Sequence, residues 1–299
     1  MTYARLRHST RVDEGDWIVS RLAPFASGVL AIVPAGFEAY IRVLHPVPVP
    51  NTGPLEKQQY VTWAEVAART GRAVHPLVQF VSIAGTRRSP LRELAGADEP
   101  REGELEPHVL KPLCDVLAGQ TSTPERCWFA LWEGFGWTQG SPAVAALTSD
   151  GPSPHILPAF PPEVTDGPRF RIPQRAYFLF EGPLAAAPEM GWNSPGGHFL
   201  PQSPNIFWPD DRAWCVATEI DLDSTYIGGS EALAEALLAE PRLETWRVQA
   251  GDPINAWSDS INAFEGSRYD VRPRRPLRSP PALLRLLGRT LRRLVPRIR

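Results

Sequence analysis

At its centre the chain reads Arg126-Cys-Trp-Phe-Ala-Leu-Trp-Glu-Gly134, an apolar run bounded by charged residues and a glycine. Two later stretches have the same pattern, Arg175-Ala-Tyr-Phe-Leu-Phe-Glu-Gly182 and Arg212-Ala-Trp-Cys-Val-Ala-Thr-Glu219. Each begins with an arginine, a small residue and an aromatic residue and continues as a short apolar run, which is typical of a buried β-strand. The three stretches therefore predict neighbouring strands of one sheet.

The rest of the chain predicts both strands and helices around that sheet. Short apolar runs predict further strands at Trp17–Val19, Val29–Val33, Phe37–Leu44 and Val78–Ile83, and the polar stretch Gly85–Gly103 predicts a loop. Capping residues and helical spacing of apolar residues predict helices at Trp63–Thr70, Glu106–Ala118 and Glu231–Glu240, and another that Asp252 and Pro253 open. The expected fold class is α+β, with a largely antiparallel β-sheet and flanking helices.

The formal charge of the chain is divided between two parts. The sequence has 31 basic and 33 acidic residues, a net charge of −2. Residues 272–299 carry ten arginines and no acidic residue, so the other 271 residues have a formal charge of −12. Such asymmetry bears on what a protein binds rather than on how it folds. We therefore expect an α+β body at 1–271, with a candidate internal boundary in the proline-rich segment 139–174, and a basic region at 272–299.

The basic region combines a proline and arginine linker with an amphipathic pattern. Pro280 and Pro281 precede residues 282–295 and Pro296 follows them, which predicts one helix between these prolines. At about 100° per residue, the leucines fall on one half of the helix surface and the arginines on the other. The site residues are Leu283, Leu287, Leu291 and Leu294 on the apolar half and Arg285, Arg289, Arg292 and Arg293 on the basic half. A helix this short is marginal in water alone, so something must cover its leucines.

Several surfaces could cover this helix. An anionic membrane surface would bury the leucines at the level of the lipid headgroups and attract the arginines. A groove on an acidic partner protein would cover them too, as would the acidic body of this chain. Nucleic acid is the least favoured partner, because a body with a charge of −12 would repel a polyanion.

The composition of the body bears on its location. The first residues are polar and lack the apolar core of a signal peptide, and the uncharged stretch Leu22–Phe37 is too short to span a bilayer. Cys114, Cys127 and Cys215 have no metal-ligand spacing, so we expect buried, reduced thiols. These features predict a cytoplasmic protein, with a peripheral position at the inner membrane surface.

A set of alternating carboxylates offers a different site. Glu219, Asp221 and Asp223 alternate with Ile220 and Leu222, so in a strand the three carboxylates would share one face. Carboxylate oxygens at this spacing suit a divalent metal such as Mg²⁺ or Ca²⁺. An ordinary antiparallel strand with one wet face has the same alternation, so both interpretations stay open.

Two resemblances concern the same part of the chain. Residues 203–230 and Arg126–Gly136 resemble segments of an uncharacterised bacterial protein family of high-GC genomes, and this resemblance implies no activity. The stretch Asp221-Leu-Asp-Ser-Thr225 resembles the first motif of haloacid-dehalogenase-type phosphatases, in which the first aspartate attacks phosphate and the second acts as acid and base. That family also has a later lysine that neutralises the phosphate, whereas no lysine follows Asp223 here.

No motif in the sequence fixes a reaction, so whether the protein is an enzyme stays open. We expect a non-enzymatic interaction module, without a cofactor, that its basic amphipathic helix recruits to an anionic surface, either a membrane or an acidic partner protein. The alternative is a metal-dependent hydrolase that holds a divalent metal at Glu219, Asp221 and Asp223.

Overall fold

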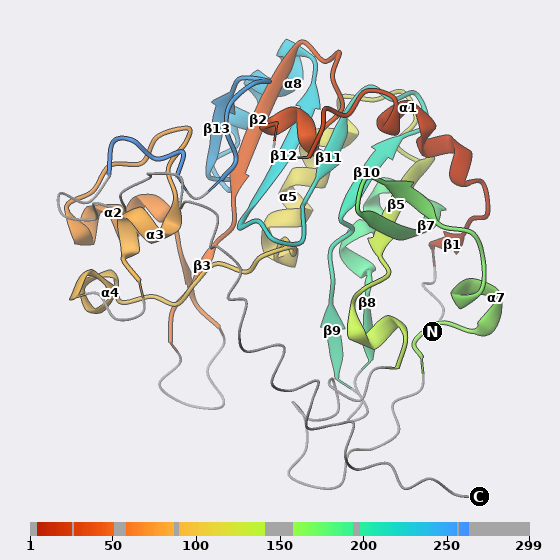
Figure 1. The fold of residues 1–299 in the computed structure, drawn as a ribbon, viewed down its shortest axis with the longest axis horizontal. Helices are drawn as coiled ribbons and strands as arrows, with labels where there is room; N and C mark the ends of the chain where they lie inside the picture. Colours follow the sequence, from red (N-terminus) through yellow and green to blue (C-terminus); the bar gives the residue numbers. More distant parts are fainter. Residues whose placement is uncertain are drawn as a thin grey trace, which may run out of the picture. The chain divides into compact units, whose positions relative to one another are not determined.

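One large β-sheet runs through the part of the chain that the structure describes (Figure 1). The computed structural model describes residues 5–25, 27–50, 58–86, 90–140, 158–193, 198–255 and 257–262. Within these ranges the sheet has nine strands in the order β1-β7-β5-β10-β11-β12-β2-β13, with β6 also paired to β7, and every pair is antiparallel. The bounds are β1 Arg7–His8, β2 Ala39–Leu44, β5 Cys127–Trp132, β6 Phe170–Ile172, β7 Arg175–Gly182, β10 Ile206–Pro209, β11 Cys215–Ala217, β12 Ser224–Gly229 and β13 Thr245–Val248.

The three stretches that share a sequence pattern form β5, β7 and β11 of this sheet. β5 pairs with β7 along its whole length, from Cys127 opposite Gly182 to Trp132 opposite Tyr177. β10 lies between β5 and β11 and pairs with both. The prediction of one sheet is confirmed, whereas direct neighbours are found only for β5 and β7.

Alternate residues of the central strands enter two different cores. In β5, Phe129 and Leu131 belong to the first core, and Trp128 and Ala130 belong to the second. The first core is covered by α5 (Pro107–Ala118), α8 (Glu231–Ala239) and the short helix η4 (Leu184–Glu189). The second is covered by the N-terminal elements η1 (Val12–Gly15), α1 (Asp16–Val19) and η2 (Val29–Ala31). Because both faces of the sheet are covered, the sequences of its central strands are continuous apolar runs. The fold class is α+β, as expected.

A third core lies beside the end of β2, among α2 (Trp63–Thr70), α3 (Phe80–Ala84) and α4 (Pro90–Ala95). The N-terminus of α2 has the predicted capping box of Thr62 and Glu65. The Glu244 carboxylate, at the start of β13, accepts hydrogen bonds from the backbone N–H groups of Trp63 at 2.7 Å and Ala64 at 2.8 Å. An acidic side chain suits this end of a helix, so Glu244 ties the helical layer to the sheet.

Short elements complete the described chain. They are η3 (Gly136–Thr138), α7 (Pro162–Thr165), the pair β3 (Val47–Pro48) and β4 (Tyr60–Val61), and the pair β8 (Gly191–Asn193) and β9 (Phe199–Pro201). α7 and β6 belong to the proline-rich segment 139–174, of which residues 141–157 lie outside the described residues. Pairing of β6 with β7 joins the end of this segment to the main sheet.

The predicted helices with clear caps are confirmed. α2 and α5 lie within one residue of their predicted bounds, and the inner side chains of α5 are buried. Ser230 begins α8 as predicted, since its Oγ accepts a hydrogen bond from the backbone N–H of Leu233 at 3.1 Å. Local capping chemistry is short-range, which is why the sequence predicts it well.

Three predicted strands are wrong. Trp17–Val19 and Val29–Val33 form α1 and η2, and the Val78–Ile83 run contributes to α3. The stretch Gly85–Gly103, predicted to be a loop, contains α4. Apolar runs of three to six residues do not distinguish a buried strand from a buried helical turn, and here packing against the sheet and α2 decides.

The helix predicted to begin at Asp252 is also wrong. Residues 252–255 and 257–262 contain no helix, and Trp257 and Ile261, expected to be buried, are 71% and 63% exposed. Asp259 accepts a hydrogen bond from the backbone N–H of Asn262 at 2.9 Å, and the Asn262 side chain bonds both backbone groups of Ala73. Bonds of this kind between side chains and backbone compete with helix formation.

The predicted C-terminal helix lies outside the described residues. The described residues all belong to the compact unit Met1–Asn262. The division into a body at 1–271 and a basic region at 272–299 therefore stays a prediction. Among the helices in the described ranges, none combines the length and the apolar character needed to cross a bilayer.

Candidate functional site

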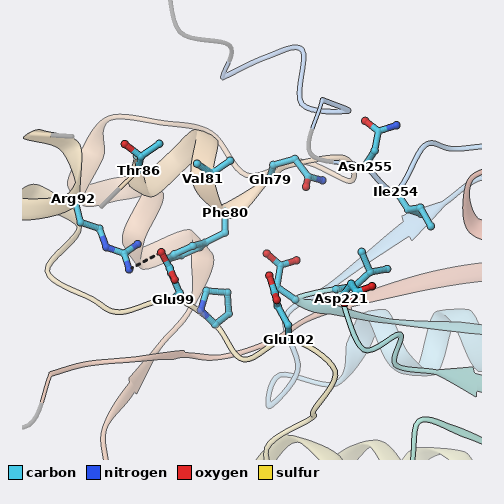
Figure 2. Close-up of a pocket in the computed structure, with 14 residues that line it drawn as sticks. Gln79, Phe80, Val81, Thr86, Arg92, Glu99, Glu102, Asp221, Ile254 and Asn255 are labelled. Carbon is cyan, nitrogen blue, oxygen red and sulfur yellow. Dashed lines mark ion pairs between the residues drawn. The ribbon is translucent and has the colours of Figure 1, made fainter. Parts of the chain in front are cut away.

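A groove of about 660 Å³ lies beside the third core. Five parts of the chain line it: α3 with its flanking residues, Arg92 of α4, the loop 99–102, the connection between β11 and β12, and residues Ile254 and Asn255. Figure 2 shows Gln79 and Phe80 of the helical side across from Glu102 and Asp221. We call it the acidic groove, after the carboxylates that line it, Glu99, Glu102, Asp221 and Asp223.

The structure places the predicted metal ligands in the connection between β11 and β12. Glu219, Asp221 and Asp223 therefore do not lie on a strand, and the prediction that they share one strand face is wrong. The chain turns here because the backbone N–H of Leu222 donates to the carbonyl of Glu219 at 3.1 Å. The backbone N–H of Asp221 donates to the Glu219 carboxylate at 2.7 Å and closes the same turn.

Arginine side chains pair with these carboxylates. Arg175, the first residue of β7, places Nε 2.8 Å from Oε1 of Glu219 and Nη2 2.8 Å from Oδ2 of Asp221. Asp223 points to a different guanidinium, with Oδ1 3.9 Å from Nη2 of Arg42. The structure thus brings Glu219 and Asp221 together on one arginine and places Asp223 near another.

The surroundings of Asp223 change the pKa of its carboxyl group. Burial raises the pKa of its carboxyl group, while the Arg42 guanidinium and a hydrogen bond from the Ser224 hydroxyl oppose that rise. Within the described ranges, no cluster of three or more His, Cys, Asp or Glu residues has the arrangement of a metal site. The divalent metal at Glu219, Asp221 and Asp223 stays a prediction.

The loop 99–103 brings further carboxylates to the groove, near those of the β11–β12 connection. This loop was not predicted from the sequence as part of a site. Gly103 adopts a φ of +68°, and its backbone N–H donates to the Leu222 carbonyl at 2.9 Å. A Cβ at this position would lie 2.7 Å from the Cα of Ile220, so only glycine allows the loop to approach the β11–β12 connection. A glycine among the acidic residues Glu99, Glu102 and Glu104 was the available signal, although it does not identify what the loop approaches.

Glu102 shows the electrostatic effect of this approach. Burial raises the pKa of its carboxyl group, and the nearby carboxylates Asp223, Asp221 and Glu99 raise it further. Among the described residues, Glu102 makes no hydrogen bond or ion pair that would offset this repulsion. The groove therefore holds negative charge that the described part of the protein does not neutralise.

His45 holds the loop in place from within the structure. Its ring is fully buried, with Nδ1 2.6 Å from the Arg101 carbonyl and Nε2 2.9 Å from the Thr225 hydroxyl. A carbonyl only accepts hydrogen bonds, so Nδ1 carries the proton and Nε2 accepts from Thr225. The Thr225 oxygen lies 2.7 Å from the Thr218 hydroxyl and accepts in turn. Burial lowers the pKa of His45 to about 4, and Arg42 contributes to the decrease.

The other candidate groups from the sequence have structural surroundings. Cys114, Cys127 and Cys215 are free and buried, as predicted, and burial raises the pKa of each thiol. Trp192 and Trp208 are also buried, and Trp192 stacks on Trp137 with ring centroids 6.1 Å apart. A buried thiol with a raised pKa is a poor nucleophile, so packing accounts for the three cysteines. Packing also accounts for the two buried tryptophans.

Comparisons of the chain with protein-family models, curated proteins and solved structures found no match. Function is therefore inferred from the groove, the contacts of the candidate residues and the charge pattern of the sequence.

The buried His45 predicts a specific dependence of stability on pH. The pKa is about 4 in the folded protein and 6.5 ordinarily, so the unfolded chain binds the extra proton between these values. The contribution of His45 to the free energy of unfolding is fully present above pH 6.5 and is lost as the pH falls toward 4. Between pH 7 and pH 5 this contribution decreases by about 2 kcal/mol. We expect urea denaturation to show this loss in the wild type, relative to His45→Gln.

The comparison with His45→Gln is needed because Glu102, Glu104, Asp223 and Glu244 have raised pKa values that act in the opposite direction in both proteins. An NMR titration of the His45 ring supplies an independent check if the variant does not fold. A ring that titrates near pH 6.5 in the folded protein, or an equal pH dependence of the two proteins, would contradict the prediction.

The ion pairs also predict the outcome of a metal titration. Arg175 pairs with both Glu219 and Asp221, so a cation would have to displace a guanidinium bound to two carboxylates. We expect calorimetric titration of the full chain with Mg²⁺, Mn²⁺ or Ca²⁺ to show no saturable heat. A saturable heat that disappears in Asp221→Asn would establish the metal site instead.

Proposed function

We propose that this chain is a non-catalytic interaction module that residues 272–299 recruit to an anionic surface. The observation that carries the proposal is the sequence of that region, in which ten arginines without an acidic residue accompany leucines at helical spacing. A helix with this composition gains most when an apolar layer covers its leucines and negative charge surrounds its arginines.

A membrane containing anionic lipids meets both requirements at once. Leu283, Leu287, Leu291 and Leu294 would insert at the boundary between headgroups and acyl chains. Arg285, Arg289, Arg292 and Arg293 would remain at the headgroups, each contributing about 1 kcal/mol of attraction. An acidic partner protein is the other surface of suitable chemistry, and the experiment below separates the two.

The contacts in the described body support a role without catalysis. The cysteine thiols are buried in the cores, and Glu219 and Asp221 share the guanidinium of Arg175. A general acid, a base or a nucleophile needs an accessible group whose protonation can change during the reaction. These residues instead have roles that packing and ion pairing explain.

Vesicle binding tests the proposal in the full chain. We expect co-sedimentation with phosphatidylcholine vesicles that contain phosphatidylserine, little with phosphatidylcholine alone, and dissociation at high salt. Replacing Arg285, Arg289, Arg292 and Arg293 by glutamine removes about 4 kcal/mol of attraction, so affinity should fall by more than about a hundredfold. Replacing Leu283, Leu287, Leu291 and Leu294 by serine should also abolish binding.

The matched control replaces the same four arginines by lysine. A lipid surface responds mainly to charge and should bind this variant nearly as well, whereas a protein groove that pairs with guanidinium groups should not. Equal binding of the wild type and the glutamine variant, or equal binding to neutral and anionic vesicles, would refute membrane recruitment.

A further inference from the structure

The acidic groove is lined by apolar side chains, which we call its apolar wall, and by carboxylates. Phe80 and Val81 of α3, together with Leu222 and Ile254, provide apolar surface. The carboxylates of Glu99, Glu102, Asp221 and Asp223 lie along the loop 99–102 and the β11–β12 connection. Figure 2 shows Glu102 and Asp221 on the side of the groove away from Val81 and Thr86. A ligand that fills this space would therefore meet apolar side chains and negative charge together.

The described arginines nearby pair with carboxylates of the groove itself, and Nη1 of Arg92 is buried without a hydrogen-bond partner in the described ranges. Arg92 lines the groove, but it lies 3.6 Å from Glu99 and over the Phe80 ring at 5.6 Å. Arg175 is bound to Glu219 and Asp221, and Arg42 donates to the carbonyls of Pro76 and Val78. Glu102 is left without an ion pair among the described residues, and its neighbouring carboxylates raise its pKa. A cationic ligand would relieve this repulsion.

Exposed apolar side chains belong to the groove and to a segment that follows it in sequence. Val81, in the groove wall, is 41% exposed, and Trp257 follows Ile254 and Asn255 with 71% of its surface exposed. Ser258 and Asp259 attach this segment to the residues before α3, through hydrogen bonds to Gln79. An exposed indole on a segment attached to Gln79 suits contact with a cationic side chain and with apolar neighbours of that side chain.

We propose that the acidic groove binds an arginine side chain on a basic, apolar peptide segment of a partner protein. Charge complementarity selects a cation, and the apolar wall favours one with a long aliphatic stem and apolar neighbours. The guanidinium offers five donors in one plane, which suits carboxylates that approach from both the loop and the β11–β12 connection. The residues that line the groove all lie outside 272–299 in the sequence, and the groove has the opposite charge, so peptide binding and membrane recruitment can each fail while the other holds.

Fluorescence anisotropy with a labelled Gly-Leu-Arg-Leu-Gly peptide tests the proposal on the full chain. The matched peptide has citrulline in place of arginine, which keeps the shape and removes the charge. We expect saturable binding of the arginine peptide that weakens with salt, and binding of the citrulline peptide that is at least about tenfold weaker. No saturable binding, or equal binding of the two peptides, would overturn the proposal.

Variants of Glu102 locate the site. Glu102 is exposed and makes no hydrogen bond among the described residues, so its replacement should leave the fold intact. We expect Glu102→Gln to weaken binding about fivefold and Glu102→Lys to weaken it further. The control variants Glu163→Gln and Glu163→Lys make the same charge changes at an exposed residue of α7 and should bind as the wild type does. An unchanged affinity of Glu102→Lys would overturn the location.

Discussion

The buried guanidinium of Arg42 is the interaction on which the groove end of this structure depends. Arg42 lies on β2, is 2% exposed, and donates to the Ser224 hydroxyl at 3.0 Å and to the carbonyls of Pro76 and Val78 at 3.0 and 2.7 Å. It also lies over the Trp63 ring, 5.4 Å from its centroid. Burying a guanidinium costs several kcal/mol unless its donors find acceptors. Because its acceptors come from β12 and from the chain before α3, and its ring contact from Trp63 of α2, one side chain joins the helical layer to the sheet.

Charge placement connects this interaction to the proposed function. Arg42 and Arg175 hold Asp223 and Asp221 at the edge of the groove, and His45 holds the loop that brings Glu102 to the same place. The groove consequently presents carboxylates beside apolar side chains. The sequence of residues 272–299 has the opposite charge and an apolar stripe. These two features support the proposed recruitment to an anionic surface and the proposed binding of a basic partner segment.

The sequence predicts the parts of this fold that local chemistry decides. The apolar runs at β5, β7 and β11, the capping box at Thr62 and the cap at Ser230 are all found where the sequence places them. Errors arise where tertiary contacts decide: Trp17–Val19 is helical because it packs on the covered sheet, and residues after Asp252 are held by Asp259 and Asn262. The carboxylates at 219–223 were recognised, but their arginine partners lie at least 44 residues away in sequence, and Glu102 reaches them through a packed glycine. Spacing along the chain contains no information about such pairs.

Hydrogen exchange of wild type and Arg42→Met tests most directly whether this guanidinium organises the groove. Methionine fills similar volume but leaves the carbonyls of Pro76 and Val78 without their donor, and it removes the bond to Ser224. We predict faster exchange in α3, in residues 75–79 and in the β11–β12 connection, with unchanged protection of β5 and β7. Equal protection of α3 in the two proteins, or a uniform loss across β5 and β7, would contradict the role assigned to Arg42.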